Sequence, residues 1–252
     1  MNMKNKIKEL LKCNLWKTVY FNFKMLPFSQ AKKLPIWFYG KTDFRSLKGN
    51  VELVGSTYSG MVSVGKQDVY VDTNVQNTIW TINGTLRLEG PIRFFRGSYV
   101  LVAKRGVLDI KSKPTELGIT KIGSNIHIFC FDKITIGYCT RIAWDCQIYD
   151  SSFHYIEYLV KNEKPATLSK PVVIGDHAWI GNRTTISKGT VIPNYAIVAS
   201  NSLVNKDFSE AGENILLAGL PAKVKASGLR RIFDRKIERE LDKQYNYSRT
   251  GL

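Results

Sequence analysis

The chain has 252 residues, of which 44% are hydrophobic, and its formal net charge is +16. This length allows one large domain or two small ones, each with a substantial core. No segment approaches the roughly 18–20 consecutive apolar residues of a membrane span, and lysines interrupt the apolar stretch that an N-terminal signal peptide would need. We therefore expect a cytoplasmic protein.

The positive charge is concentrated at the two ends of the chain. Residues 1–50 contain eleven Lys/Arg and two Asp/Glu, residues 222–252 contain nine and four, and residues 51–221 are nearly neutral. Basic ends suit peripheral contact with an anionic membrane surface or another polyanion, or form a solvated basic face. No recognised nucleic-acid module accompanies the charge, so we expect no nucleic-acid partner.

The cysteines form neither a CxxC pair nor a spacing typical of zinc sites. In a reducing compartment such residues behave as small apolar side chains, so we expect them to be buried and unpaired. They are Cys13, Cys130, Cys139 and Cys146.

The N-terminal part of the chain divides into two stretches. Residues 1–50 form a basic segment, and at least the first half of "KNKIKELLKCNLWKTVYFNFKML" has a helical composition. In residues 51–120, "INGTLRLEGPI" and "VLVAKRGVLDI" alternate apolar and polar residues around glycines. This alternation indicates short strands, which we interpret as the irregular first coils of the repeat described next.

From residue 172 onward an aliphatic residue recurs every six positions, and a small or β-branched residue lies two positions before each of them. A period of six fits a short strand followed by a sharp turn, and three such units close one triangular coil with the aliphatic side chains inside. Stacked coils share one core, so the repeat predicts an all-β solenoid over residues 51–221. The aliphatic positions are Ile174, Ile180, Ile186, Ile192, Val198 and Val204, with Ile136, Ile142 and Ile148 upstream. The preceding small positions are Val172, Ala178, Thr184, Thr190, Ala196 and Ser202.

The residues directly before the inward aliphatics should point outward, yet most of them are apolar. Such a face favours a subunit partner over scattered surface hydrophobics. These residues are Val173, Trp179, Thr185, Val191, Ile197 and Leu203.

The period is interrupted once. The separation between Ile148 and Ile174 is not a multiple of six, so part of the intervening chain must leave the solenoid. We predict a loop over residues 150–172, with His154 near its start. Loops that project from a rigid scaffold are common places for catalytic groups.

The C-terminal residues 222–252 are predicted to form an amphipathic helix and a tail. In "LRRIFDRKIEREL" an apolar stripe is surrounded by Arg and Glu, which indicates a helix packed on the solenoid. The stripe consists of Ile232, Phe233, Ile237 and Leu241.

Three features together resemble a known family. They are the hexad repeat, the "DSSFH" at residues 150–154, and "KPVVIGDHAWIGNRTTISKGTVIPNYAIVASNSLVNKDF" followed by "AGLPAKV" at 218–224. Residues 120–225 resemble the hexapeptide-repeat acyltransferases, in particular the acetyl-CoA-dependent O-acetyltransferases that modify sugars of cell-surface polysaccharides such as capsule and O-antigen. The resemblance implies a left-handed parallel β-helix, acetyl-CoA as co-substrate, a sugar acceptor and a homotrimer that binds its substrates between subunits.

The resemblance also implies roles for particular residues. The family motif is Asp-x-Asp-Phe-His, so His154 is the expected general base, a task that suits a group titrating near neutrality. Asp150 is expected to assist it; if the motif's second acid normally orients the histidine, Asp150, Glu157 or a backbone carbonyl must take over that task. The second acidic position is Ser152 here, which changes either the orientation of the histidine or the contact with the acceptor. Trp179 is expected to donate its indole N–H to the acyl oxygen or to anchor the trimer, and Trp144 to line the acceptor pocket.

The expected CoA contacts lie at turns of the later coils, where backbone and side-chain groups are free. No metal is expected, because hexapeptide-repeat carbonic anhydrases have closely spaced histidine ligands, whereas the three histidines here are widely separated along the chain. His127 and His177 are expected to be structural or solvent-facing. The predicted CoA residues are Gly181, Ser200, Asn205, Lys206 and Lys223.

Two other functions remain compatible with the sequence. In the first, the protein is an acetyltransferase whose acceptor is a small sugar, an antibiotic or an amino sugar. The second is a hexapeptide-repeat scaffold without catalytic activity.

Overall fold

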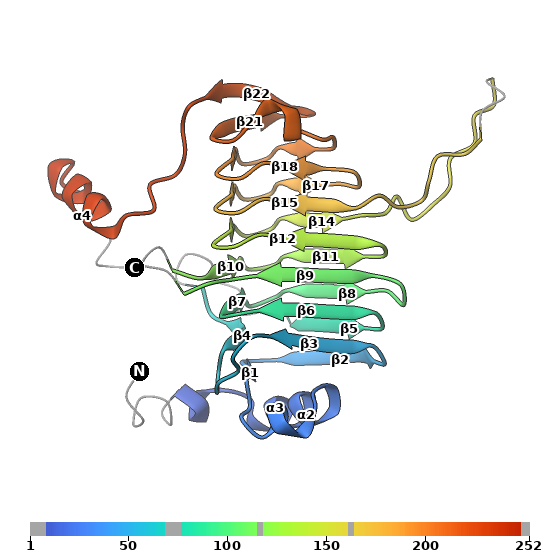
Figure 1. Ribbon diagram of the computed structural model, residues 1–252, viewed down its shortest axis with the longest axis vertical. Coiled ribbons are helices and arrows are strands. Elements are labelled where there is room, and N and C mark those ends of the chain that lie inside the picture. Colours follow the sequence, from blue (N-terminus) through green and yellow to red (C-terminus); the bar gives the residue numbers. More distant parts are fainter. Residues whose placement is uncertain (1–8, 69–76, 115–117, 161–163, 248–252) are drawn as a thin grey trace.

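The chain winds into a triangular prism of parallel strands (Figure 1). The computed structural model describes residues 9–68, 77–114, 118–160 and 164–247. Parts of the two predicted basic ends, residues 1–8 and 248–252, therefore lie outside the described residues. From β1 to β20, each strand of the prism pairs in parallel with the strand three places away in the chain, so three sheets form its three faces.

The sheets are named A, B and C in the order in which the chain visits them. Sheet A contains β1 (Ile36–Phe38), β4 (Val62–Lys66), β7 (Ile92–Phe95), β10 (Thr120–Ile122), β13 (Arg141–Ile142), β16 (Trp179–Ile180), β19 (Ile197–Val198), β21 (Ile215–Gly219) and the antiparallel β22 (Ala222–Ser227). Sheet B contains β2 (Thr42–Leu47), β5 (Thr78–Ile82), β8 (Tyr99–Val102), β11 (His127–Cys130), β14 (Gln147–Tyr149), β17 (Thr185–Ile186) and β20 (Leu203–Val204). Sheet C contains β3 (Asn50–Val54), β6 (Thr85–Glu89), β9 (Val107–Lys111), β12 (Lys133–Ile136), β15 (Val172–Ile174) and β18 (Val191–Ile192).

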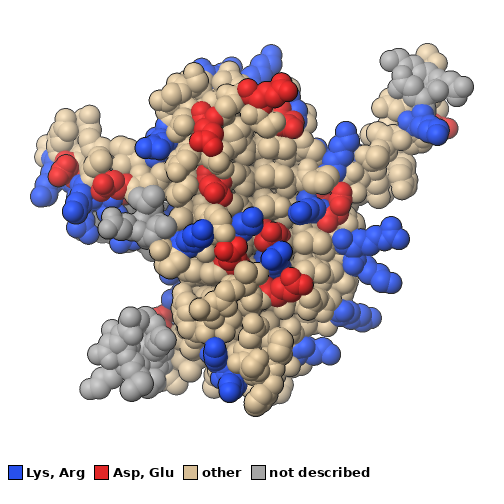
Figure 2. All heavy atoms as spheres, in the orientation of Figure 1, with Lys and Arg blue, Asp and Glu red and all other residues tan. Residues whose placement is uncertain are grey.

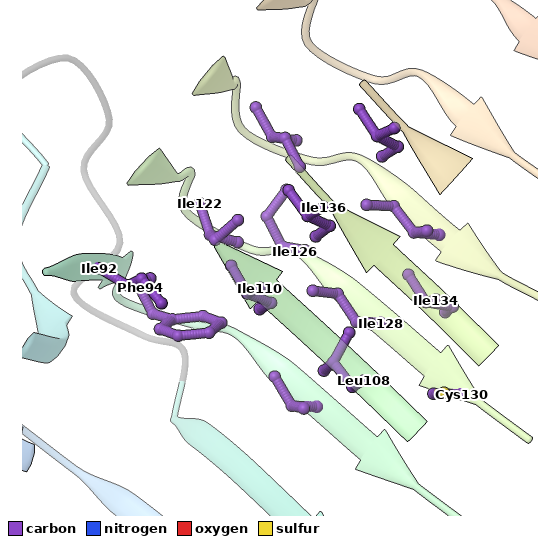
Figure 3. Close-up of a cluster of buried hydrophobic side chains, with 14 of the residues drawn as sticks. Ile92, Phe94, Leu108, Ile110, Ile122, Ile126, Ile128, Cys130, Ile134 and Ile136 are labelled. Carbon is purple, nitrogen blue, oxygen red and sulfur yellow. The ribbon is translucent and has the colours of Figure 1, made fainter. Parts of the chain in front are cut away.

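Each of the late coils consists of three hexads. Ile174 pairs with Ile192, and Ile186 pairs with Val204, one coil further along. All the predicted inward aliphatics from residue 172 onward are at most 1% exposed, and so are the small residues two positions before them. Figure 3 shows how such side chains from successive coils meet along the axis of the prism. The predicted parallel β-helix and its inward residues are confirmed.

Sharp corners explain why the period is six rather than longer. One residue in each hexad, three positions after the inward aliphatic, has a positive φ, which turns the chain by a large angle within a single residue. Over the late coils this residue is glycine only once, so the other side chains are held in the left-handed region by the pairing of neighbouring coils. The positions are His177, Arg183, Gly189, Tyr195 and Asn201.

The early coils are wider and filled with aromatic rings. Trp80, Phe38 and Phe94 are fully buried, and the ring centroids of Phe38 and Trp80 are 5.4 Å apart. Longer strands replace the two-residue strands of the late coils, and therefore no hexad is visible in this part of the sequence. The first solenoid strand begins at Ile36, inside the range 1–50 that was predicted as the N-terminal segment.

Two helices close the N-terminal end of the prism (Figure 1). They are α2 (Leu15–Met25) and α3 (Phe28–Ala31), and a helical stretch at residues 9–12 precedes them. Phe21 and Met25 of α2 join the solenoid core. Asn22, also buried, donates to the Ile36 carbonyl at 2.7 Å and accepts from the Ile36 N–H at 3.2 Å, which ties α2 to β1.

The C-terminal helix α4 (Arg235–Gln244) lies beside the solenoid and follows an extended segment of the chain (Figure 1). Asp234 caps its N-terminus by accepting from the N–H groups of Lys236 and Ile237. No residue of α4 is buried, so the helix is packed on the solenoid less closely than its apolar stripe suggested. None of the described helices is long and apolar enough to cross a lipid bilayer.

Candidate functional site

The break in the period corresponds to an inserted arm. Ile134 of β12 pairs with Val172 of β15, whereas Ile174 pairs with Ile192, so the coil that carries the arm is more than twice as long as a regular one. The arm leaves at the corner between sheets B and C, after β14, and projects away from the prism (Figure 1). The outgoing and returning segments of the arm meet at its base, where the Ser152 N–H donates to the Leu168 carbonyl at 2.9 Å. The arm starts directly after Asp150 and contains His154.

Asp150 holds the base of the arm to the preceding coil. Its carboxylate is fully buried and accepts from the backbone N–H groups of Phe131 and Asp132, both at 2.8 Å. Burial raises the pKa of the Asp150 carboxyl above its usual value, and the two N–H donors partly oppose this. These bonds direct the carboxylate toward the corner of the coil, so its task in the structure is to position the backbone, and the predicted assistance to His154 stays a prediction.

Phe153 adopts a strained conformation directly before the histidine. Its φ is +64°, which is rare for an aromatic residue. The conformation is held by its own N–H, which donates to Ser151 Oγ at 3.1 Å, and by edge-to-face contacts with the rings of Phe129 and Phe131. The strain therefore fixes the direction in which the chain continues, and the exposed His154 follows with its N–H bonded to the Ser152 carbonyl.

Ser152 is bonded to a lysine of the next coil. Lys188 Nζ donates to Ser152 Oγ at 3.0 Å and to the Thr167 carbonyl at 2.6 Å, so it links the outgoing and returning segments of the arm. Ser152 Oγ in turn lies within hydrogen-bonding distance of the His154 carbonyl, at 3.1 Å. Where the related motif has an acid, this chain has a neutral hydroxyl that is already held by a cation. Lys188 was not predicted from the sequence, because one lysine in a hexad carries no distinguishing signal.

The outer face of sheet B next to the arm is covered with rings, here called the aromatic ladder. Tyr99 packs edge-to-face on Phe129 at 5.1 Å, and Tyr149 lies 5.9 Å from Phe153. His127 also belongs to the ladder, since it packs against Tyr99 and Phe129, and burial lowers its pKa. Alternation along β8, β11 and β14 places these rings on one face, which the early strand pattern of the sequence could have revealed. The aromatic ladder consists of Tyr99, His127, Phe129, Tyr149 and Phe153.

His177 occupies a corner of the prism. Its ring stacks on Tyr195 of the next coil, with centroids 4.7 Å apart and an angle of 3° between the planes. Burial lowers the pKa of its imidazole. Both rings belong to residues with positive φ, so the stack reinforces two successive corners.

Trp144 and Trp179 line a cavity of about 340 Å³ on sheet A. The indole of Trp179 is 41% exposed, and the Arg231 guanidinium lies 5.7 Å from its ring centroid. The C-terminal segment before α4 forms one wall of the cavity, and Lys121 and Arg141 line another. His154 is not among the described residues that line it. Within one chain, the predicted base and the predicted indole donor therefore lie on different faces of the prism.

This cavity has an excess of cationic groups, since four Lys and Arg side chains line it beside Asp68 and Glu238. Burial, together with the neighbouring Arg141 and Arg93 guanidinium groups, lowers the pKa of Lys121 to about 8. Burial likewise lowers the pKa of Arg141 to about 10, still far above neutral pH. A folded protein that gathers such charges at one opening is suited to bind an anionic group there. The sequence analysis did not single out Lys121 or Arg141, because residues so far apart in the chain meet only when the coils stack.

The depressed pKa of Lys121 predicts a pH dependence of stability. Between pH of about 8 and 10.5 the unfolded lysine holds a proton that the folded one has released, so the free energy of unfolding rises with pH across this window. We expect Lys121→Met to flatten the rise. Urea unfolding at pH 7, 8, 9 and 10 measures it, with the exposed Lys133→Met as control. Equal slopes for Lys121→Met and the unmodified protein would contradict the prediction.

The predicted CoA residues fall into two groups. Gly181 and Ser200 stack at the corner between sheets A and B, and a Cβ on Gly181 would lie 2.5 Å from the Ser200 nitrogen, so only glycine fits there. Ser200 Oγ donates to Asn182 Oδ1 at 2.5 Å. Lys206 and Lys223 line a second cavity, of about 560 Å³, near the C-terminal end of the solenoid, and the exposed Asn205 is the residue directly before Lys206.

The four cysteines are free and buried, as expected. Among the described residues, no group of three or more His, Cys, Asp or Glu side chains could hold a metal ion.

Comparison with known proteins places the chain among acyltransferases. A protein of the Klebsiella pneumoniae cps region, described as an uncharacterized 24.8 kDa protein, is 31% identical over 205 residues, which are 80% of this chain and 83% of that protein. The putative lipopolysaccharide biosynthesis O-acetyl transferase WbbJ of Escherichia coli K12 is 32% identical over 111 residues, 41% of this chain. The chain belongs to the hexapeptide-repeat acyltransferase family. No protein-family model matches it.

The fold is shared with a solved structure. The polysialic acid O-acetyltransferase OatWY superposes with a TM-score of 0.51 at 22% identity, over 83% of this chain and 100% of that protein. This likeness confirms the left-handed parallel β-helix. The match spans about half the length of the first curated relatives, 55% of WbbJ and 45% of a putative acetyltransferase of Dictyostelium discoideum. The match to these relatives therefore does not establish the activity of the whole protein.

Proposed function

We propose that the protein is an acetyl-CoA-dependent O-acetyltransferase that modifies a sugar hydroxyl of a cell-surface polysaccharide. The observation that carries the proposal is the placement of His154. It is exposed, directly follows the strained Phe153, and lies on an arm whose base is fastened by Asp150 and Lys188. A base that must meet its substrate in a defined geometry needs such a rigid support.

In the proposed reaction His154 accepts the proton of the acceptor hydroxyl as the hydroxyl oxygen attacks the thioester carbonyl carbon. The indole N–H of Trp179 donates to the carbonyl oxygen as negative charge develops on it. When the carbon–sulfur bond breaks, His154 returns the proton to the departing thiolate, so the products are an acetyl ester and free CoA.

The site is proposed to be completed in a homotrimer. His154 and Trp179 lie on different faces of one chain, so a neighbouring subunit would bring the second residue to the first. The arm supports this arrangement, because Leu159 and Val160 at its far end are 88% and 98% exposed. Apolar side chains at the end of a projecting arm are suited to pack on another subunit.

The aromatic ladder supports a sugar as the acceptor. Its rings lie on the outer face of sheet B and end at Phe153, the residue next to His154. Flat apolar ring faces pack against the C–H faces of sugar rings, and the hydroxyl groups of the sugar stay available for reaction. Ser152, where the related motif has an acid, is proposed to contact this acceptor, and Trp144 to line its pocket on the neighbouring subunit.

Basic side chains beside the ladder support an acidic polysaccharide. Figure 2 shows Lys and Arg side chains along the edge of the prism below the arm. The turns between sheets B and C carry exposed basic residues at this edge, which attract a polyanion over several coils. These residues are Lys48, Lys104, Arg105 and Lys133.

The donor is proposed to reach the site along the later coils. Lys206 and Lys223 share one cavity and are placed to bind the phosphates of CoA, while Gly181, Ser200 and Asn205 would contact its arm at the turns. The buried, unpaired cysteines are consistent with the proposed cytoplasmic location, where this donor is available.

The experiment that tests the function is a screen of acyl-CoA donors and sugar acceptors that follows the release of free thiol. We expect release with acetyl-CoA that depends on the acceptor. Release with none of the donors would favour a non-catalytic scaffold, and release only with small sugars, antibiotics or amino sugars would reject the polysaccharide acceptor.

Trp179→Phe separates the two roles proposed for the indole. Phenylalanine keeps an aromatic ring but removes the N–H donor, so we expect kcat to fall by about 10²-fold, with a smaller change in the KM for acetyl-CoA. Light scattering should give an unchanged molar mass. Wild-type kcat for Trp179→Phe, together with loss of the trimer in Trp179→Ala, would leave Trp179 as a subunit anchor only.

A further inference from the structure

The N-terminal helix α2 has apolar side chains on two faces, and only one of them is packed in the solenoid core. On the other face, Tyr20 stacks on Phe44 of β2. Phe21 and Met25 enter the solenoid core, together with the buried Thr18 and Asn22. At about 100° per residue, the exposed apolar side chains occupy an arc of about 140° on the outer side of the helix. They are Leu15, Trp16, Tyr20 and Phe23.

The arc continues beyond the ends of α2. Leu11 precedes it and is 77% exposed, and Phe28, in α3, is 71% exposed. Phe23 lies 6.1 Å from Phe28 and Trp16 lies 6.5 Å from Tyr20, so the rings form one surface, here called the end patch. Trp16, at 73% exposure, is its largest side chain. A monomeric protein rarely exposes apolar side chains in such a group without a partner for them.

The charges around the end patch identify the partner. Residues 10–35 contain no Asp or Glu, and helix geometry places Lys17 and Lys24 along one edge of the apolar arc of α2. Lys12 is paired with Glu9 at 3.0 Å, and Lys33 donates to the Thr57 carbonyl. Tryptophan and tyrosine with flanking lysines are the composition of helices that lie in the interface of an anionic bilayer, where the rings enter the headgroup region and the ammonium groups meet phosphates. The lysines are Lys12, Lys17, Lys24, Lys32 and Lys33.

We propose that the end patch docks the protein on a membrane surface rich in anionic phospholipid. The patch closes one end of the prism, whereas the arm leaves sheet B four strands further along (Figure 1). At about 4.8 Å per strand, this holds His154 roughly 20 Å from the first coil, so docking leaves the arm free in solution. The surface is separate from the proposed catalytic residues, and the inference does not depend on the proposed function.

Co-sedimentation of the full chain with vesicles tests the proposal. We expect binding to vesicles of phosphatidylglycerol and phosphatidylethanolamine, weak binding to phosphatidylcholine alone, and a loss of affinity in high salt. The variant Trp16→Ser/Phe28→Ser should lose about tenfold or more of its affinity. Its matched control, Tyr245→Ser/Tyr247→Ser, removes two exposed rings at the other end of the chain and should bind normally.

A second pair of variants tests the charges. Lys24→Gln/Lys32→Gln/Lys33→Gln should lose about fivefold for each lysine, and Lys104→Gln/Arg105→Gln/Lys133→Gln, with the same loss of charge at another edge, should bind like the unmodified protein. Thiol release without vesicles should be unchanged in Trp16→Ser/Phe28→Ser, which separates this result from the test of the proposed function. Absence of binding to anionic vesicles, or equal binding by Trp16→Ser/Phe28→Ser, would overturn the proposal. So would a reduced molar mass of that variant in light scattering with unchanged vesicle binding, which would identify the patch as a contact between copies of the chain.

Discussion

Replacing His154 with alanine is expected to lower acetyl-CoA turnover by about 10²–10⁴-fold, the contribution of a positioned general base. Because the side chain is exposed and its backbone N–H, not its imidazole, makes the local bond to the Ser152 carbonyl, the fold should be unaffected. Thiol release measures turnover, and light scattering and urea unfolding check assembly and stability.

The matched control for His154→Ala is His177→Asn. Asparagine tolerates the φ of +56° at that corner, and His177 lies in a stack with Tyr195 rather than on the arm. The control should retain turnover. If His154→Ala is as active as the unmodified protein, the proposed mechanism is wrong even if the acyltransferase activity itself is present.

Asp150→Ala is expected to have the largest effect on stability among the site residues. It removes the acceptor of two partly buried N–H groups, those of Phe131 and Asp132. At about 1–3 kcal/mol for each unsatisfied donor, the free energy of unfolding should fall by about 2–6 kcal/mol. Turnover should fall as well, because the base of the arm loses its attachment to the preceding coil. Urea unfolding and thiol release measure the two effects.

Asp150→Asn refines this test. The amide keeps the shape and one acceptor oxygen, so it should destabilise less than alanine. Burial raises the pKa of Asp150 above its ordinary value of 3.8. Between pH 3.8 and the folded pKa, the folded protein holds a proton that the unfolded chain has released, so the free energy of unfolding falls as pH rises through this range. Asparagine should abolish this contribution. The exposed Asp43→Ala serves as control, and an equal stability of Asp150→Ala and Asp43→Ala would contradict the structural task assigned to Asp150.

The prediction of the fold was most accurate where one position decides the packing. In the late coils every inward aliphatic is the last residue of a strand of two or three residues and is followed by a corner, so the period is visible in the amino-acid sequence itself. In the early coils the strands are longer, and rings such as Trp80 and Phe38 fill a wider interior. Alternation along these strands predicted their presence, but their lengths and their start at Ile36 depended on contacts with coils far away in the sequence.

The candidate site was less accessible to prediction. The motif drew attention to Asp150, Ser152 and His154, and the structure shows what surrounds them. Lys188 reaches Ser152 from the next coil, and Phe129 supports Phe153 from the preceding one. Neither partner is near the motif in the sequence, and neither belongs to a recognisable pattern.

The amino-acid sequence was sufficient to predict the solenoid, its inward residues, the place where the arm leaves it and the family resemblance. Each of these depends on residues that are repeated or adjacent along the chain. Folding in three dimensions was needed to show that Asp150 faces the backbone, that Lys121 and Arg141 share a cationic cavity with Trp179, and that α2 exposes a second apolar face. This division follows from the stacking of coils. Stacking brings distant residues into contact and separates neighbours onto different faces, so the surroundings of a side chain are set by other coils rather than by its own segment.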